Sequence, residues 1–346
     1  MNQMNLSAIG WKPFFQQQVQ QEHFEHPKIA RVSAHYGSQI LLHGENGEFS
    51  IPTQLADSVG DVAVGDWLVL DQNNRVSQRL ERTTLLSRKA SGEEVKSQLI
   101  AANIDTIFIV SSCNEDFNLS RIERYLAVTL QVGATPVVVL TKADLCQSVQ
   151  KLRKEVERLH TGLLVETVNS RNPDDVSVLI PWCQPGQSIA LLGSSGVGKS
   201  TLANTLGVGS LATGAIREKD GKGRHTTTAR SLHLLPSGGV LVDNPGMREF
   251  QLPACGDGVA DLFDDIFRIA EKCRFTNCNH NGDVGCAVEA AIATGELDQR
   301  RFASFMKLNA EQAHNSRSLA ERRERDRKNG RMYKSVIAEK RRRKEA

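Results

Sequence analysis

A nine-residue segment in the middle of the chain constrains the fold more than any other feature. Residues 193–201 read Gly-Ser-Ser-Gly-Val-Gly-Lys-Ser-Thr and directly follow the apolar run Ile189–Leu192. The pattern G-x-x-x-x-G-K-[ST] between a strand and a helix is typical of a loop whose backbone N–H groups surround phosphate oxygens. The segment therefore predicts an α/β core that binds a nucleotide.

This loop assigns separate tasks to its residues. Lys199 is expected to reach the β- and γ-phosphates, and Ser200 is expected to ligate Mg²⁺. The glycines let the backbone turn inward around the phosphates. The nucleotide-binding residues expected here are Gly193, Ser194, Ser195, Gly196, Val197, Gly198, Lys199, Ser200 and Thr201.

Short apolar runs alternate with helix-like segments on either side of the loop. Strands are expected at Thr106–Val110, Pro136–Leu140, Leu163–Val168, Ser188–Leu192 and Val240–Val242. Helices are expected at Ser120–Gln131, Gln147–His160 and Gly198–Leu206. This alternation predicts a parallel sheet with helices on both faces over residues 93–252.

A second motif indicates which base the site binds. Thr141-Lys142-Ala143-Asp144 follows the strand expected at Pro136–Leu140 and is similar to the guanine-reading N/T-K-x-D element of GTPases. A carboxylate at Asp144 can accept hydrogen bonds from guanine N1–H and the 2-amino group, which adenine does not offer. Lys142 is expected to lay its aliphatic stem over the base. Thr141 stands where Asn is commoner.

Two further segments complete the set of phosphate-sensing elements. Asp243-Asn244-Pro245-Gly246 resembles the D-x-x-G element of GTPases, in which Asp243 holds Mg²⁺ through water and the Gly246 N–H meets the γ-phosphate. The polar, Gly-rich segment 221–228 is suited to a switch that becomes ordered around γ-phosphate and Mg²⁺. One of Thr226–Thr228 is expected to ligate the metal.

The order of the motifs differs from that of ordinary GTPases, in which the phosphate loop comes first. Here Thr141–Asp144 precedes Gly193–Thr201, which precedes Thr226–Thr228 and Asp243–Gly246. Chain order does not alter a site if the same sheet is assembled, so a circular permutation of the domain explains the arrangement. The permutation also ties the segment after Asp243 covalently to whatever follows it.

Hydrolysis needs a group that orients the attacking water. Many GTPases use a Gln directly after D-x-x-G, but Met247 stands there in this chain, and a thioether cannot orient water. Unassisted hydrolysis is therefore expected to be slow. His225, in the expected switch, is the candidate catalytic residue, and the alternative is that it is only an exposed loop residue.

Three cysteines and a histidine follow the nucleotide motifs at close spacing. Cys273-x4-Cys278-x-His280-x5-Cys286 supplies three thiolates and one imidazole, a closed tetrahedral set typical of structural zinc. Cys255 is an outside alternative ligand, and a group of incidental cysteines is the other interpretation. Seven cysteines with one tight cluster argue against a secreted disulfide framework.

The ends of the chain differ in character from its middle. Residues 1–28 are Gln-rich and are expected to form a flexible arm, and residues 29–92 contain short β-type runs that suggest an OB-fold or a purely structural β-domain. Residues 253–316 are expected to form a helical zinc-binding domain. Residues 317–346 carry a net charge of +8, whereas the preceding 316 residues carry −5. This helical or disordered tail favours a nucleic-acid partner or is simply solvated.

Targeting signals are not apparent in the sequence. No apolar run approaches the ~20 residues that span a bilayer, and the first ten residues do not have the layout of a signal peptide. A cytoplasmic protein without membrane contact is expected.

Together these residues resemble the ribosome small-subunit-dependent GTPase A family, also called RsgA or YjeQ. The permuted order, Gly193–Thr201, the block Gly223–Thr228 and the Cys/Cys/His/Cys spacing carry the resemblance. It implies an α/β protein with an N-terminal OB-fold, a central circularly permuted P-loop GTPase domain and a C-terminal zinc-binding, helical domain. It also implies a monomer that binds GTP, GDP and the 30S subunit with its 16S rRNA, and that acts in late 30S maturation with ribosome-stimulated hydrolysis.

Three positions depart from the family pattern. Thr141 replaces Asn, Asn244 replaces Thr, and Asn169-Ser170 only approximates the S-A element that supports guanine. Two other functions remain compatible with parts of the sequence. A nucleotide-gated RNA-binding module with incidental hydrolysis shares every motif, whereas a P-loop ATPase or small-molecule kinase leaves Thr141–Asp144 unexplained.

Overall fold

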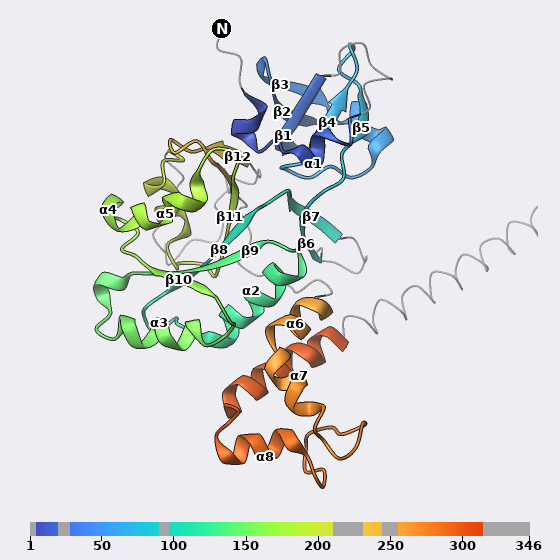
Figure 1. Ribbon diagram of the computed structural model, residues 1–346. Coiled ribbons are helices and arrows are strands. Elements are labelled where there is room, and N and C mark those ends of the chain that lie inside the picture. Colours follow the sequence, from blue (N-terminus) through green and yellow to red (C-terminus); the bar gives the residue numbers. More distant parts are fainter. Residues whose placement is uncertain (1–4, 20–27, 90–96, 210–230, 244–254, 314–346) are drawn as a thin grey trace, which may run out of the picture.

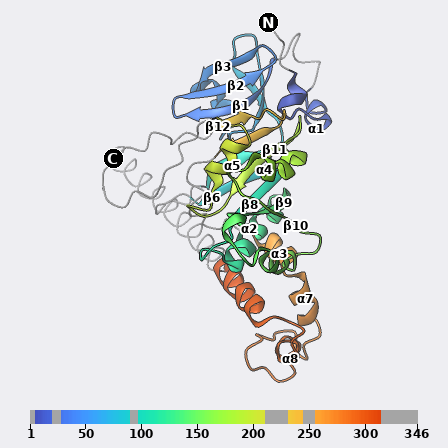
Figure 2. The ribbon, with the colours of Figure 1, turned by 90° about the vertical axis from the view of Figure 1, so that its left-hand side faces the viewer.

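The computed structural model describes residues 5–19, 28–89, 97–209, 231–243 and 255–313. The described parts lie in a row, with a β-rich unit at the top, an α/β sheet in the middle and a helical module at the bottom (Figure 1). The view turned by 90° shows the same row (Figure 2). Among the residues that the structure describes, no helix is both long and apolar enough to cross a membrane.

The first unit is an antiparallel sheet in the order β5-β4-β1-β2-β3. Its elements are β1 (Lys28–Tyr36), β2 (Gln39–Gly44), β3 (Gly47–Pro52), η3 (Thr53–Val59), β4 (Trp67–Leu70) and β5 (Val76–Arg79). Strands β2 and β3 form a hairpin that turns at residues 44–47, and Gly47 supplies the positive φ of 98° that this tight turn needs. Five antiparallel strands around their own apolar core agree with the predicted OB-fold.

The central sheet has the strand order β10-β9-β8-β11-β13-β12. Its strands are β8 (Thr106–Ser112), β9 (Thr135–Thr141), β10 (Leu164–Thr167), β11 (Ser188–Leu192), β12 (Ser231–Leu234) and β13 (Val240–Asp243). All neighbours are parallel except β12 and β13, which are antiparallel. The predicted parallel sheet is therefore confirmed, with one antiparallel strand at its side.

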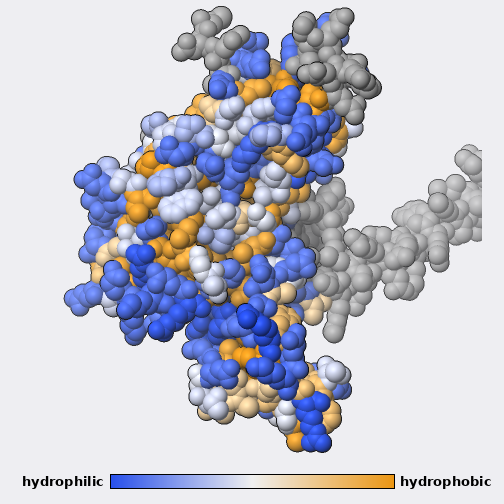
Figure 3. Space-filling model, in the orientation of Figure 1, coloured by the Kyte–Doolittle hydropathy of each residue, from blue (hydrophilic) through white to orange (hydrophobic). Residues whose placement is uncertain are grey.

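Helices cover both faces of this sheet, as predicted. One face packs against α2 (Leu119–Gln131) and α3 (Val149–Glu157), and the other packs against α4 (Pro173–Val176), η5 (Ser177–Cys183) and α5 (Lys199–Thr205). Along β8, Ile107 and Ile109 point to the first face, and Phe108 and Val110 point to the second. The surface over α3 is hydrophilic, as expected for an amphipathic helix (Figure 3).

The β-rich unit and the central sheet are joined without a break. β1 pairs with β12 at Ala34 and Ser231, which makes one sheet of 11 strands. A separate hairpin of β6 (Leu85–Lys89) and β7 (Ser97–Ala102) connects the two parts along the chain. The expected domain boundary between residues 92 and 93 falls between these two paired strands.

The N-terminal arm differs from its prediction. Residues 5–19 form η1 (Leu6–Ile9) and α1 (Pro13–Gln16), with Leu6, Ile9 and Phe15 buried. The ring of Trp11 meets that of Trp67 edge-on at 4.8 Å. The prediction of a flexible arm is wrong for these residues, because their few apolar side chains are too unevenly spaced to show a helical face but suffice to anchor the segment.

A buried arginine ties this arm to the other parts. Arg31 on β1 is 1% exposed and donates hydrogen bonds to the carbonyls of Ile9, Gly65 and Asn103 and to the hydroxyl of Ser188. Burial lowers its pKa to about 10, with Asp105 and Asp66 opposing the shift. The guanidinium is therefore still charged near neutral pH.

The helical module packs against α2. It contains α6 (Gly256–Leu262), α7 (Asp264–Ala270), α8 (Ala287–Thr294) and a helix over residues 299–313. Glu123 on α2 is fully buried and pairs with Arg300 at 3.0 Å and Arg301 at 3.6 Å. Gly258 allows the close crossing, because a Cβ there would lie 2.0 Å from the carbonyl oxygen of Ala127.

We expect Arg31→Met to lower the free energy of unfolding by roughly 3–5 kcal/mol, because it removes a buried charge and leaves its acceptors unpaired. Urea unfolding followed by circular dichroism measures this change. Arg75→Met, at an exposed position, is the matched control and should change stability by less than about 0.5 kcal/mol. Equal effects of the two substitutions would contradict the role given to Arg31.

Candidate nucleotide site and metal centre

The expected nucleotide motifs meet at one edge of the central sheet. β8, β9, β11 and β13 run parallel, so their carboxyl ends lie together. Thr141 ends β9, Gly193 follows β11, and Asp243 ends β13. The carboxyl edge of a parallel α/β sheet is where ligands bind in such folds.

The phosphate loop has a backbone that only glycine permits at several positions. A Cβ on Gly193 would lie 2.3 Å from the carbonyl oxygen of Val110, so the loop passes directly over β8. Gly196 and Gly198 have φ of 80° and 97°, in the left-handed region. The Lys199 ammonium donates to the carbonyls of Gly193 (2.7 Å) and Ser194. Lys199 stands at the start of α5, and its ammonium group therefore lies within the curve of the loop.

Thr141 connects the base-reading motif to this loop. Its side chain is fully buried, and its hydroxyl donates to the Val197 carbonyl at 2.5 Å, with the Ser111 carbonyl at 3.3 Å. Thr141, which stands where Asn is commoner, thus presents a polar side chain that hydrogen-bonds to the phosphate loop. The rest of the motif follows at the surface, with Lys142 at φ 56° and Asp144 exposed in η4 (Ala143–Leu145).

The segment Asn169-Ser170, which the sequence supports only weakly, lies beside the same loop. The Ser170 carbonyl accepts from the Thr205 hydroxyl at 2.7 Å. The Ser170 hydroxyl is buried and would lie 3.5 Å from a Cβ built on Gly198. This segment therefore lies beside the phosphate loop.

Two residues at the site were not identified from the sequence. Asp116 and Arg121 both hydrogen-bond the hydroxyl of Ser194, at 3.1 and 3.0 Å. They follow β8, which lies next to β11, and nothing in their local spacing marks them as part of a nucleotide site. Only the pairing of these two strands could have indicated them.

Several predicted residues lie outside the described part of the chain. These are His225, Thr226–Thr228, Asn244, Gly246, Met247 and the tail over residues 317–346. Of the motif Asp243–Gly246, the structure describes Asp243 alone. Asp243 lies at the end of β13 and pairs with Ser231 of β12.

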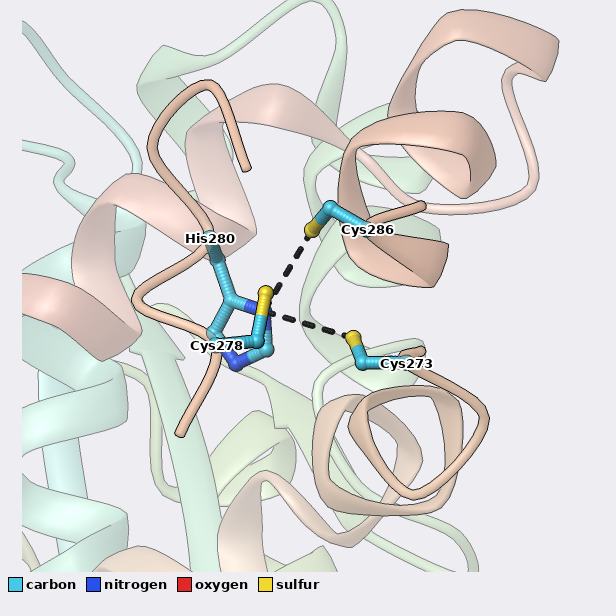
Figure 4. Close-up of side chains that lie close together, drawn as sticks. All are labelled: Cys273, Cys278, His280 and Cys286. Carbon is cyan, nitrogen blue, oxygen red and sulfur yellow. Dashed lines mark hydrogen bonds between the residues drawn. The ribbon is translucent and has the colours of Figure 1, made fainter. Parts of the chain in front are cut away.

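The second predicted site is assembled in the helical module. The ligand atoms of Cys273, Cys278, His280 and Cys286 all lie within 4.8 Å of one another, and these side chains converge from separate turns (Figure 4). His280 Nδ1 is 3.6 Å from the Cys273 sulfur and 3.4 Å from the Cys286 sulfur. Tetrahedral Zn–S and Zn–N bonds place such atoms roughly 3.5 Å apart, so the four residues fit a metal of this type.

Backbone groups around the cluster favour thiolates. The N–H of Ala287 points to the Cys273 sulfur at 3.3 Å, and that of Glu289 points to the Cys286 sulfur at 3.4 Å. The alternative ligand Cys255 lies elsewhere, fully buried with its sulfur accepting from Gln312 at 3.0 Å. The four-residue set proposed from the sequence is therefore the one that the fold brings together.

These features define a class of protein. A P-loop follows β11, the fourth strand of the central sheet along the chain, and the base-reading motif precedes it at the end of β9. The domain is therefore a circularly permuted P-loop domain of the GTPase type. An antiparallel β unit precedes it, and a helical module with a Cys₃His cluster follows.

Comparison with known proteins gives the family. Residues 79–253 match the family described as RsgA GTPase. A relative from Vibrio parahaemolyticus, named small ribosomal subunit biogenesis GTPase RsgA 2, is 49% identical over 342 residues, which cover 99% of this chain and 95% of the relative. A relative from Mesorhizobium japonicum, named small ribosomal subunit biogenesis GTPase RsgA, is 44% identical over 90% of this chain and 91% of its own. The chain belongs to the RsgA GTPase family.

Solved structures share the fold. YjeQ from Thermotoga maritima has a TM-score of 0.59 at 21% identity and covers 83% of this chain and 99% of its own. YloQ, described as a circularly permuted GTPase, has a TM-score of 0.60 at 22% identity over 86% of this chain and 98% of its own. The permuted topology inferred from motif order is therefore confirmed.

We expect Cys278→Ser to lower the bound metal from about one ion per chain and to loosen the helical module, because metal binding contributes folding free energy. Elemental analysis of protein purified without added metal measures the ion content. Cys146→Ser, outside the cluster, is the matched control and should keep the full content. Full metal content in Cys278→Ser would indicate a different ligand set.

Proposed function

We propose that this protein binds GTP with Mg²⁺ and hydrolyses it to GDP and phosphate during late maturation of the 30S ribosomal subunit. The observation that carries the proposal is the hydrogen bond from Thr141 to the Val197 carbonyl, which joins a guanine-type motif to a phosphate loop. The names of its close relatives, which describe small ribosomal subunit biogenesis GTPases, support the cellular process.

The roles of the residues follow from their chemistry. Asp144 accepts from guanine, Lys142 covers the base, and the loop N–H groups with Lys199 bind the phosphates. Ser200 and Asp243 would hold Mg²⁺, and the Gly246 N–H would bind the γ-phosphate. Bound Mg²⁺ neutralises charge on the phosphates. The GTP-binding set is Thr141, Lys142, Asp144, Gly193, Ser194, Ser195, Gly196, Val197, Gly198, Lys199, Ser200, Thr201, Asp243 and Gly246.

Zinc is the metal that suits the cluster of Cys273, Cys278, His280 and Cys286. Three sulfurs and one nitrogen at tetrahedral spacing match its preferred structural ligands, and all four positions come from protein, which makes the role structural. Zinc bound by these four residues would hold together the turns between α7 and α8 and so stabilise the helical module.

The partners are the 30S subunit and its 16S rRNA, in the cytoplasm, with the protein acting as a monomer. The net charge of +8 over residues 317–346 supports contact with a polyanion. An OB-type β unit is a common module for binding oligonucleotides, and it supports the same assignment.

Base selectivity is expected to depend on Asp144. Asp144→Asn should shift preference from GTP toward xanthosine triphosphate, because an amide can donate to the xanthine 2-oxo group where a carboxylate only accepts. Competition binding of GTP, ATP and XTP to both proteins measures the shift. Asp57→Asn, at an exposed position on the β unit, should keep GTP preference. Wild-type protein that binds ATP as well as GTP would refute the guanine assignment.

Turnover is expected to depend on the 30S subunit and on His225. Hydrolysis should be slow alone or with 50S subunits and faster with 30S subunits, since Met247 cannot orient water. His225→Ala should keep GTP affinity and lose most of the stimulated kcat, as expected for a contact made only in the transition state. Steady-state phosphate release with each subunit measures these rates.

His160→Ala is the matched control for the histidine, because it lies after α3 and away from the phosphate loop. If His225→Ala keeps the full stimulated kcat, the catalytic group must come from the ribosome. If 30S subunits bind but never change turnover, the protein acts instead as a nucleotide-gated RNA-binding module.

A further inference from the structure

Three side chains form a closed set of hydrogen bonds beside the phosphate loop. Arg121 Nη1 is 2.9 Å from Asp116 Oδ2 and donates to Ser194 Oγ at 3.0 Å. Ser194 Oγ in turn donates to Asp116 Oδ2 at 3.1 Å. The serine hydroxyl thus accepts from a guanidinium and donates to a carboxylate, which leaves it one favourable orientation.

The charges of this set are maintained by its own contacts. Burial acts to raise the pKa of Asp116, but the hydrogen bonds and charge of Arg121, with the Ser194 hydroxyl, prevail and leave that pKa below its usual value. Arg121 and Asp116 are 35% and 43% exposed, so their mutual attraction alone is weak. The effect of Arg121 and Asp116 on the phosphate loop therefore depends on the position in which they hold Ser194.

Ser194 is fixed from two sides. Its carbonyl accepts from the Lys199 ammonium, and its hydroxyl is bound by Arg121 and Asp116. The loop residue next to it, Ser195, is exposed. The loop must keep its N–H groups directed at the phosphates. Side chains from outside the loop thus anchor its first turn.

The helix that carries Arg121 is itself well anchored. Asn118 caps α2 by accepting from the Arg121 N–H at 3.0 Å. Further along, buried Glu123 pairs with Arg300, and Arg124 pairs with Glu311 of the helical module. Arg121 therefore projects from a rigid element, which is what a group needs in order to position a loop.

We propose that Arg121, held by Asp116, is a positioning residue that fixes the phosphate loop through the hydroxyl of Ser194. The proposal rests on the proposed GTP-binding function of that loop. Because the contact is made entirely within the protein, it holds the loop in one conformation and reduces the cost of ordering it on binding.

A double-mutant cycle with fluorescent GDP tests this role. Arg121→Met and Ser194→Ala should each speed nucleotide dissociation about fivefold. The double variant should dissociate no faster than the single variants, because both remove the same interaction. Arg121→Lys keeps a charged donor and should fall between wild type and Arg121→Met. Multiplied effects in the double variant would overturn the proposal.

Arg153→Met is the matched control, since Arg153 makes an ion pair of similar exposure with Glu157 on α3 and does not contact the loop. Its dissociation rate should equal that of wild type, and urea midpoints should show that every variant is folded. If Arg121→Met dissociates like wild type while Lys199→Ala loses binding, the positioning role is wrong and the nucleotide site stands. If wild type itself does not bind GDP, the proposed function fails.

Discussion

The buried guanidinium of Arg31 is the interaction on which the arrangement of the first two parts depends. Burying a charge is costly unless each of its hydrogen-bond donors finds an acceptor. The acceptors of Arg31 come from four separate segments: the N-terminal arm, the β unit, the residues before β8 and the start of β11. Asp105 reinforces the joint by binding Lys12 and the N–H of Ser188. The strand that leads into the phosphate loop is therefore held at its first residue.

At the other end of that strand the requirements are steric and polar. Gly193 passes over the Val110 carbonyl, and Thr141 bonds the Val197 carbonyl, so β8, β9 and β11 each contribute to the loop's shape. These contacts depend on strand adjacency and not on chain order, which is why a permuted sequence can assemble a GTPase-type site. The Cys/His cluster is independent of this edge, and its convergence follows from local turns.

The sequence predicted most of this architecture because its signals are local. The runs that became β8, β9 and β11, the loop at residues 193–201 and the Cys/His spacing each identify themselves within a few residues. What it could not predict depends on contacts between distant segments. The order of the N-terminal arm depends on the packing of Trp11 against Trp67. Asp116 and Arg121 lie at the nucleotide site only because β8 pairs with β11. The hydrogen bond from the Thr141 hydroxyl to the Val197 carbonyl is likewise a contact that only the geometry reveals.

The place of β11 in the sheet has a consequence for how the chain folds as it is synthesised. Its neighbour β8 precedes it, but its other neighbour, β13, follows it in the chain. Until residues 240–243 have emerged, β11 has one open edge, and unpaired edges of apolar strands invite association with other chains. Closing that edge is a long-range step, which makes folding slow relative to local structure. The nascent chain is thus most vulnerable to aggregation after its phosphate loop is made and before its sheet is complete.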